Sequence, residues 1–441
     1  MRRRTLAAAL LLAAACGAPE DADLAADLDA DLDAALAPAA EAYVKLVLAL
    51  GDHDPAYVDA YYGPEEWRAE ATASPPTAIQ IGDSASALAA TVAQLDLTGA
   101  EEDWQLRASY LQRQLEAVAA HADRLGGRTM SFDEEARALY DVDPPEHTAE
   151  EFQAILDRLD ERLPGSGPIN ERYQQWRDAF IIPAERLDTV FRAAIAEARR
   201  RTVERLELPE DERFELEYVT NKSWSGYNWY QGDARSLIQL NTDLPIHIDR
   251  AIDLAAHEGY PGHHVYNVLI EQELVRERGW PEFQVYPLFS PQSLIAEGSA
   301  NYGIDVAFPG EERVSFEREV LYPLAGLDPA RAAEYREIQA LAAELSYAGN
   351  EAARRYLNGD FTREEAAEWL TRYGLMDPER ALQRTRFMDD YRSYVINYNL
   401  GRDMVADYVE RLGGTADDPE RRWEVFGSLL ASPRLPSNLR E

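Results

Sequence analysis

The sequence predicts a mainly α-helical protein that carries one small antiparallel β-hairpin sheet. Across most of the chain, apolar residues recur at three- and four-residue steps, the pattern of amphipathic helices. Helix-start signals accompany these stretches, and only residues 214–241 show the two-residue alternation of strands. The chain has 441 residues, of which 46% are apolar and 28% charged, which is the composition of a globular protein.

The N-terminus has the features of a bacterial export signal. Three arginines, Arg2 to Arg4, precede an apolar run over 6–15 that is too short to span a bilayer but typical of a signal peptide. The run ends at Cys16, the only cysteine, in a context similar to a lipobox. We therefore expect a signal peptide over 1–15 and a lipid on Cys16, which would anchor the protein in the cell envelope. The alternative is an ordinary signal peptide cut near Ala15, which would leave the protein periplasmic or secreted.

Residues 16–40 are predicted to form an acidic tether. Residues 17–40 contain seven acidic residues and no basic one, and such low-complexity sequence repels itself and buries little apolar surface. No later segment resembles a linker between domains. The remainder, 41–441, is therefore expected to be a single helical catalytic domain.

Helices are expected over 101–126, 147–163 and 169–206, the last with a kink or break at Pro183. Thr362 and Glu365 are spaced as a capping box, and Asp377 followed by Pro378 predicts another helix start.

Strands are expected just before the histidine-rich segment. Residues 214–220 alternate, and 225–241 predict a hairpin that turns near 231–233. The aromatic residues of this region, Trp224, Tyr227, Trp229 and Tyr230, allow two interpretations: they fill the core, or they flank an edge strand that pairs with an extended peptide.

The charge excludes some partners. The formal net charge is −36, and only two of the 44 basic residues are lysines. Nothing here would neutralise phosphates, so we expect no nucleic-acid partner and no membrane contact apart from the lipid anchor.

Three of the seven histidines lie within 257–264, His-Glu-Gly-Tyr-Pro-Gly-His-His, after a predicted helix over 248–256. In an H-E-x-x-H helix the two histidines share one face and bind zinc. In this sequence Pro261 occupies the position of the second histidine, four residues after His257. On a regular helix His263 would lie roughly 120° from His257, and His264 some 10 Å further along the axis. Pro261 and Gly262 favour a distortion that would bring His263 back over His257. A plain turn with surface histidines is the alternative.

A third metal ligand is predicted downstream. Ser290 and Pro291 start a helix in which Glu297 is the one acid among small and apolar residues. A carboxylate in such a segment is costly to bury unless it is paired or bound to a cation.

Residues 257–264 resemble the H-E-x-x-P-G-H-H signature of the bacterial domain-of-unknown-function 885 family, which is similar to the zincin-like gluzincin metallopeptidases. The segment Glu297-Gly-Ser-Ala-Asn-Tyr302 resembles that family's E-G-W-A-L-Y element, and Tyr398-x-x-Gly401 its Y-x-x-G element. The resemblance implies a helical zincin-like fold and a Zn²⁺ site made by His257, His263 and Glu297.

This metal site predicts a peptide hydrolase. Glu258 would act as general base on a water activated by zinc, and a donor for the oxyanion is expected among Tyr398, His264 and Arg402. Two other classes remain open: a lipoprotein that binds metal or peptide without catalysis, and an inert helical scaffold.

Overall fold

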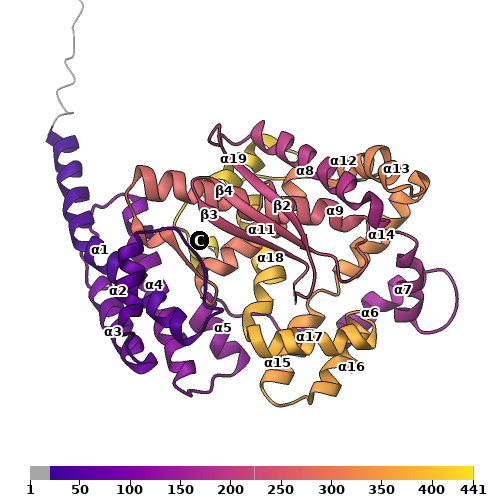
Figure 1. Ribbon diagram of the computed structural model, residues 1–441, viewed down its shortest axis with the longest axis horizontal. Helices are drawn as coiled ribbons and strands as arrows, with labels where there is room; N and C mark the ends of the chain where they lie inside the picture. The colour runs from indigo at the N-terminus through magenta and orange to yellow at the C-terminus, as the bar shows by residue number, and fades with distance from the viewer. Residues whose placement is uncertain (1–19, 223, 441) are drawn as a thin grey trace, which may run out of the picture.

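The computed structural model describes residues 20–222 and 224–440 and confirms the mainly helical fold with a small sheet (Figure 1). The predicted signal peptide and the predicted lipid site, Cys16, lie outside the described residues.

The first helix corrects the predicted tether. Helix α1 spans Glu20–His53 and contains Pro38. Leu32 and Leu36, one turn apart, are buried in the core, and Asp33 forms a 2.7 Å ion pair with the buried Arg107. The tether is therefore wrong for the second half of 16–40, because leucines at four-residue spacing give α1 an apolar face despite its acids. Its part Leu28–His53 is long and apolar enough to cross a membrane, but half of the apolar 18-residue window within it is buried, as in a core helix.

Four further helices, α2 (Glu65–Ala73), α3 (Ala78–Val92), α4 (Glu102–Leu125) and α5 (Phe132–Tyr140), lie with α1 on one side of the molecule, at the left in Figure 1. Helix α6 (Ala149–Asp160) follows. The predicted break at Pro183 is confirmed, since α7 (Ile169–Asp178) and α8 (Leu187–Val203) are separate helices on either side of it.

The predicted hairpin is confirmed as β3 (Gly226–Gly232) and β4 (Arg235–Asn241), which pair antiparallel. Strand β2 (Arg213–Val219) lies on the other side of β4 and parallel to it. Ile238 and Leu240 of β4 pack against Phe191 of α8 and Leu254 of α9 (Asp249–Leu254). Tyr230 is buried, whereas Trp229 is 47% exposed. A separate two-stranded sheet pairs β1 (Val58–Tyr61) with β5 (Val285–Pro287).

The C-terminal part is helical throughout and comprises α12 (Gly310–Phe316), α13 (Tyr322–Ala325), α14 (Ala332–Ala343), α15 (Ala348–Leu357), α16 (Arg363–Tyr373), α17 (Pro378–Tyr391), α18 (Ile396–Arg411) and α19 (Pro419–Leu430). Both predicted helix starts are confirmed: Thr362 and Glu365 form the capping box of α16, and Asp377 caps α17.

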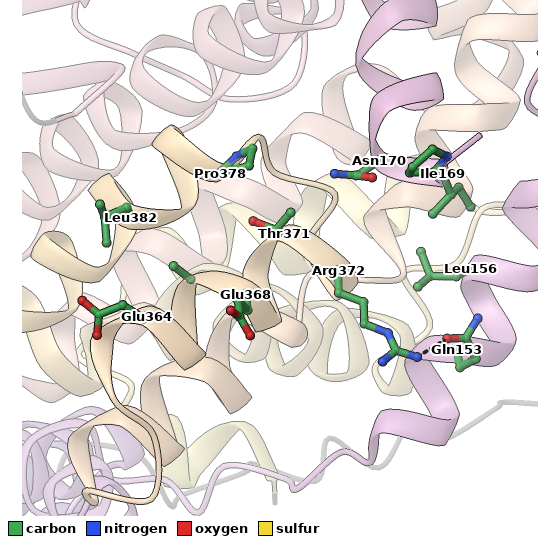
Figure 2. A pocket seen from close by; sticks show the side chains of 12 residues that line it. Gln153, Leu156, Ile169, Asn170, Glu364, Glu368, Thr371, Arg372, Pro378 and Leu382 are labelled. Atoms are coloured by element: carbon green, nitrogen blue, oxygen red, sulfur yellow. Dashed lines mark hydrogen bonds between the residues drawn. The ribbon is translucent and has the colours of Figure 1, made fainter. Parts of the chain in front are cut away.

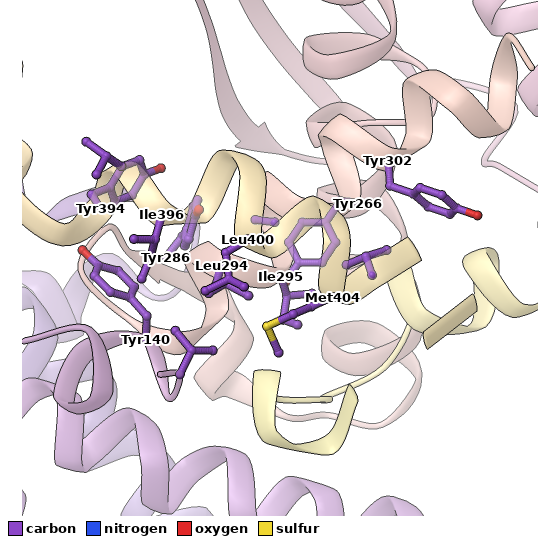
Figure 3. Packing of buried hydrophobic residues seen from close by; sticks show 14 of the residues in the cluster. Tyr140, Tyr266, Tyr286, Leu294, Ile295, Tyr302, Tyr394, Ile396, Leu400 and Met404 are labelled. Atoms are coloured by element: carbon purple, nitrogen blue, oxygen red, sulfur yellow. The ribbon is translucent and has the colours of Figure 1, made fainter. Parts of the chain in front are cut away.

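Helices α11 (Pro291–Ala307) and α18 pack closely at a pair of glycines. A Cβ on Gly298 would lie 2.4 Å from the backbone carbon of Gly401, so neither position has room for a side chain. Around this contact, Leu294 of α11 packs beside Leu400 and Met404 of α18 (Figure 3). The close approach holds the segment after Tyr394 against the helix that carries Glu297.

Candidate metal centre

The histidine-rich segment interrupts a helix. Helix α9 continues into a π-helical turn, Ala255–Gly259, and a new helix, α10 (His263–Leu269), begins after Gly262. The Gly262 amide donates to the Ala256 carbonyl, six residues earlier, at 2.9 Å. A Cβ on Gly262 would lie 1.9 Å from the His257 carbonyl oxygen, so only glycine fits there. This break, and not a regular helix, sets the relative position of His257 and His263.

The three predicted ligands lie close together: His257 and His263 come from either side of the helix break, and Glu297 comes from α11. The Nε2 atoms of His257 and His263 are 3.2 Å apart, and Glu297 Oε2 lies 3.3 Å from the first and 3.7 Å from the second. Zinc with its usual bond lengths in a tetrahedral site separates neighbouring ligand atoms by about 3.3 Å. Within residues 20–222 and 224–440, these three form the one group of at least three His, Cys, Asp or Glu side chains close enough to hold a metal ion.

The electrostatics of the three residues fit a cation as well. Glu297 Oε2 is buried and has no hydrogen-bond partner among the described residues. Burial would raise the pKa of Glu297, but the imidazoles of His257 and His263 outweigh it and hold the pKa well below its usual range. Burial alone would lower the pKa of His263, but Glu297 and neighbouring carboxylates outweigh burial and raise this pKa to about 9. The donor set therefore attracts positive charge to this point, and a zinc ion fits it.

Tyr394, which was not predicted from the sequence, contacts Glu297, and the Tyr398 ring packs against Tyr394. The Tyr394 hydroxyl donates to Glu297 Oε1 at 2.7 Å, which leaves Oε2 directed at the histidines. Burial, followed by the charge of Glu297, raises the pKa of Tyr398 well above its usual range. Its hydroxyl therefore keeps its proton and can donate a hydrogen bond near the centre.

The predicted general base, Glu258, is buried beside the sheet. A Cβ on Gly226, the first residue of β3, would lie 2.6 Å from Glu258 Oε1, so the missing side chain makes room for the carboxylate. The Asn228 side chain donates to the Glu258 carbonyl at 2.7 Å and ties the turn to β3. Among the described residues no side chain or backbone group donates to the Glu258 carboxylate, which leaves it able to accept a proton.

A further carboxylate, Asp59 of β1, also faces this centre and was not predicted. It accepts a hydrogen bond from Tyr227 at 3.1 Å. Burial raises the pKa of Asp59 to about 6, and the hydrogen bond from Tyr227 and the charge of His263 oppose that rise. No local pattern marks Asp59, because it is more than 190 residues from His257 in sequence.

Two of the predicted oxyanion donors, His264 and Arg402, are hydrogen-bonded to other side chains. His264 is fully buried and directed at the sheet: Nδ1 lies 2.8 Å from Ser236 Oγ and Nε2 lies 3.0 Å from Glu212 Oε2, so neither nitrogen is left to bind substrate. The Arg402 guanidinium donates to Asp305 at 2.6 Å and to Asp403 at 2.9 Å, so two carboxylates already neutralise its charge. Of the three candidates, Tyr398 is the one whose ring packs against the tyrosine that contacts Glu297, with the centroids of Tyr394 and Tyr398 5.8 Å apart.

A separate groove of about 610 Å³ lies between α6, α7, α16 and α17 (Figure 2). Leu156, Ile169 and Leu382 are among its lining residues, and none of the metal-site side chains lines it. It therefore takes no part in the chemistry of the centre.

Comparison with known proteins shows a shared fold. The structure of a candidate lipoprotein from Colwellia psychrerythraea matches with a TM-score of 0.51 and 15% identity, over 83% of this chain and 66% of the other. A candidate lipoprotein of unknown function from Shewanella oneidensis matches with a TM-score of 0.43 and 14% identity, over 82% and 75% of the two chains. This chain thus spans just under two thirds of the Colwellia protein. No protein-family model and no curated protein matches the chain.

Proposed function

We propose that this protein is a zinc-dependent hydrolase of peptides, related in mechanism to the gluzincin metallopeptidases and to the 885 family that its motifs resemble. The observation that carries the proposal is the triangle of His257, His263 and Glu297, whose ligand atoms are separated by the distances that tetrahedral zinc requires. About 12–13% of each histidine side chain is exposed, so solvent and substrate reach the centre.

The residues around the triangle have complementary roles in this proposal. Zinc held by these ligands supplies a Lewis acid and lowers the pKa of water to about 7. Glu258 accepts the proton of the attacking water and passes it to the leaving amine. Tyr398, which stays protonated, donates a hydrogen bond to the oxygen that becomes negative. Tyr394 holds Glu297 in the orientation that ligation needs.

The proposed location is the cell envelope. The solved Colwellia neighbour is described as a candidate lipoprotein, and the lone Cys16 follows an apolar run of signal-peptide length. Together these support export and attachment of a lipid to Cys16, with the helical domain outside the cytoplasm.

A non-catalytic lipoprotein that binds metal or peptide is the second candidate. The comparisons support it more than the hydrolase, because the Colwellia protein is described as a lipoprotein and no activity is given. Glu258 distinguishes the two candidate functions. It is a buried carboxylate next to the first ligand, His257, and it has no hydrogen-bond donor among the described residues. A protein that only carries metal has no need of such a group.

A peptide-library digest tests the proposal. The purified full chain, loaded with one equivalent of zinc, is incubated with the library with and without a chelator, and products are identified by mass spectrometry. Cleavage that the chelator stops and added zinc restores supports the hydrolase. Zinc binding without any cleavage supports the second candidate.

A further inference from the structure

Helix α17 carries an arginine whose charge is not neutralised. The chain has 80 acidic and 44 basic residues, so an arginine side chain normally finds a carboxylate. Yet within residues 20–222 and 224–440 the Arg384 guanidinium forms no ion pair and no hydrogen bond, and its contact is the ring of Phe387, 4.0 Å away. The side chain is only partly exposed. Burying a cation in this way costs stability, which is typical of a residue kept for binding.

Arg384 lies on the side of α17 that faces the metal centre. The Phe387 ring that its guanidinium contacts stacks on Tyr391, with centroids 4.4 Å apart, and Tyr391 lies 5.9 Å from Tyr394. The Tyr394 hydroxyl donates to Glu297. A continuous row of aromatic rings thus connects the unpaired guanidinium to the carboxylate of the centre.

More positive charge lies behind Arg384. Arg380, one turn earlier on the same face of α17, also has no ion pair among the described residues. The cations Arg177 and Arg250 also lie near Arg380. Arg177 and Arg250 have acids at 3.6 Å, whereas Arg380 and Arg384 have none that close in the part of the chain that the structure describes. An anion at Arg384 would therefore meet a favourable potential in an otherwise acidic protein.

We propose that Arg384 binds the C-terminal carboxylate of a peptide whose adjoining residues lie at the metal centre. The planar guanidinium matches a carboxylate, and an arginine without an internal partner has its donors available for one. This inference rests on the proposed function only in taking a peptide as the ligand. It assigns to the site a preference for peptides with a free C-terminus over internal segments.

Binding without turnover tests the assignment. The probes are two pools of N-acetylated pentapeptides that lack Asp and Glu, one with free C-termini and one amidated, so that no side-chain carboxylate contributes. Binding to zinc-loaded E258Q protein is measured by calorimetry, which needs no catalysis. A charge-assisted contact predicts that the free-acid pool binds roughly 10- to 100-fold more tightly than the amide pool.

The variants identify the residue responsible. Arg384→Gln, added to E258Q, should reduce binding of the free acids to the level of the amides with little change in the melting temperature, because no ion pair or hydrogen bond is lost and only the contact with the Phe387 ring is weakened. Arg384→Lys should keep part of the preference. Arg386→Gln, at an exposed position on the same helix, is the matched control and should keep all of it.

Several results would overturn the assignment: equal binding of acids and amides before any change at Arg384, a preference that survives Arg384→Gln, or binding of neither pool. If wild-type protein cleaves no peptide while the preference depends on Arg384, the hydrolase proposal fails and the carboxylate site stands.

Discussion

Tyr394 offers a sharp test of the metal centre, because its hydroxyl touches Glu297 and nothing else in the proposed ligand set. Tyr394→Phe removes the 2.7 Å hydrogen bond to Glu297 Oε1 and leaves the ring in its buried place. A hydrogen bond to a charged group contributes about 1.5–3 kcal/mol, and partners of metal ligands are typically worth 10- to 100-fold in affinity. We therefore expect Tyr394→Phe to bind zinc roughly 10- to 100-fold more weakly than wild type, measured by competition with a chromophoric chelator.

The neighbouring Tyr140 provides a matched control. Its ring packs edge-on against Tyr394, with centroids 6.2 Å apart, and its buried hydroxyl has no hydrogen-bond partner among the described residues. Tyr140→Phe removes the same atom from the same cluster, so its zinc affinity should stay within about twofold of wild type. If Tyr394→Phe also keeps wild-type affinity, or if both variants lose it equally, Glu297 is not a ligand oriented by Tyr394.

Three further predictions concern the surroundings of the centre and the N-terminus. Burial raises the pKa of Glu212, but hydrogen bonds from His264 and its neighbours outweigh the effect of burial and lower the pKa to about 2. The lowered pKa contributes roughly 3 kcal/mol to the free energy of unfolding. This contribution is complete above pH about 4.5 and is lost as the pH falls towards 2. His264→Ala should therefore shift acid unfolding, followed by circular dichroism, to higher pH while zinc content stays at one per chain; loss of zinc would make His264 a ligand. Gly262→Ala places a Cβ 1.9 Å from the His257 carbonyl oxygen and should abolish zinc binding or folding, with metal analysis and melting curves as readouts; a wild-type result would contradict the described turn. Cys16→Ser should move the protein from the membrane fraction to the soluble or unprocessed fraction, and unchanged fractionation would favour simple secretion.

The geometry of the histidine segment was accessible to sequence reasoning because its causes are local. Pro261 cannot continue a helix, and Gly262 alone tolerates the approach of the His257 carbonyl, so a break between the two histidines follows from residue chemistry. Glu297 was accessible for a similar reason, since an acid inside an apolar helix needs a compensating charge. In these cases the controlling interactions lie within a few residues of the side chain concerned.

The remaining site residues depend on packing between distant elements. Asp59 comes from β1, which pairs with β5, and Tyr394 precedes α18, which is held on α11 by Gly298 and Gly401. Nothing near either residue in the sequence marks it. The direction of His264 was missed for the same reason, because the strand that carries Ser236 sets it.

The error at α1 has a different cause. The density of aspartates over residues 17–40 favoured a tether, but charge density does not exclude a helix when leucines recur every four residues. Leu32 and Leu36 pack in the core, while the neighbouring Asp31 and Asp33 are exposed. Periodicity was the better guide to structure than composition in this segment.

The most direct test of the central claim is the effect of Glu258→Gln on zinc content and peptide cleavage, measured together on one preparation. The substitution keeps the size of the side chain but removes the oxygen that accepts a proton. We predict about one zinc per chain, an unchanged melting temperature, and cleavage reduced by roughly 10²- to 10⁴-fold from wild type. Cleavage that survives within about threefold would contradict the proposed hydrolase, and loss of zinc together with activity would show that Glu258 is itself a ligand.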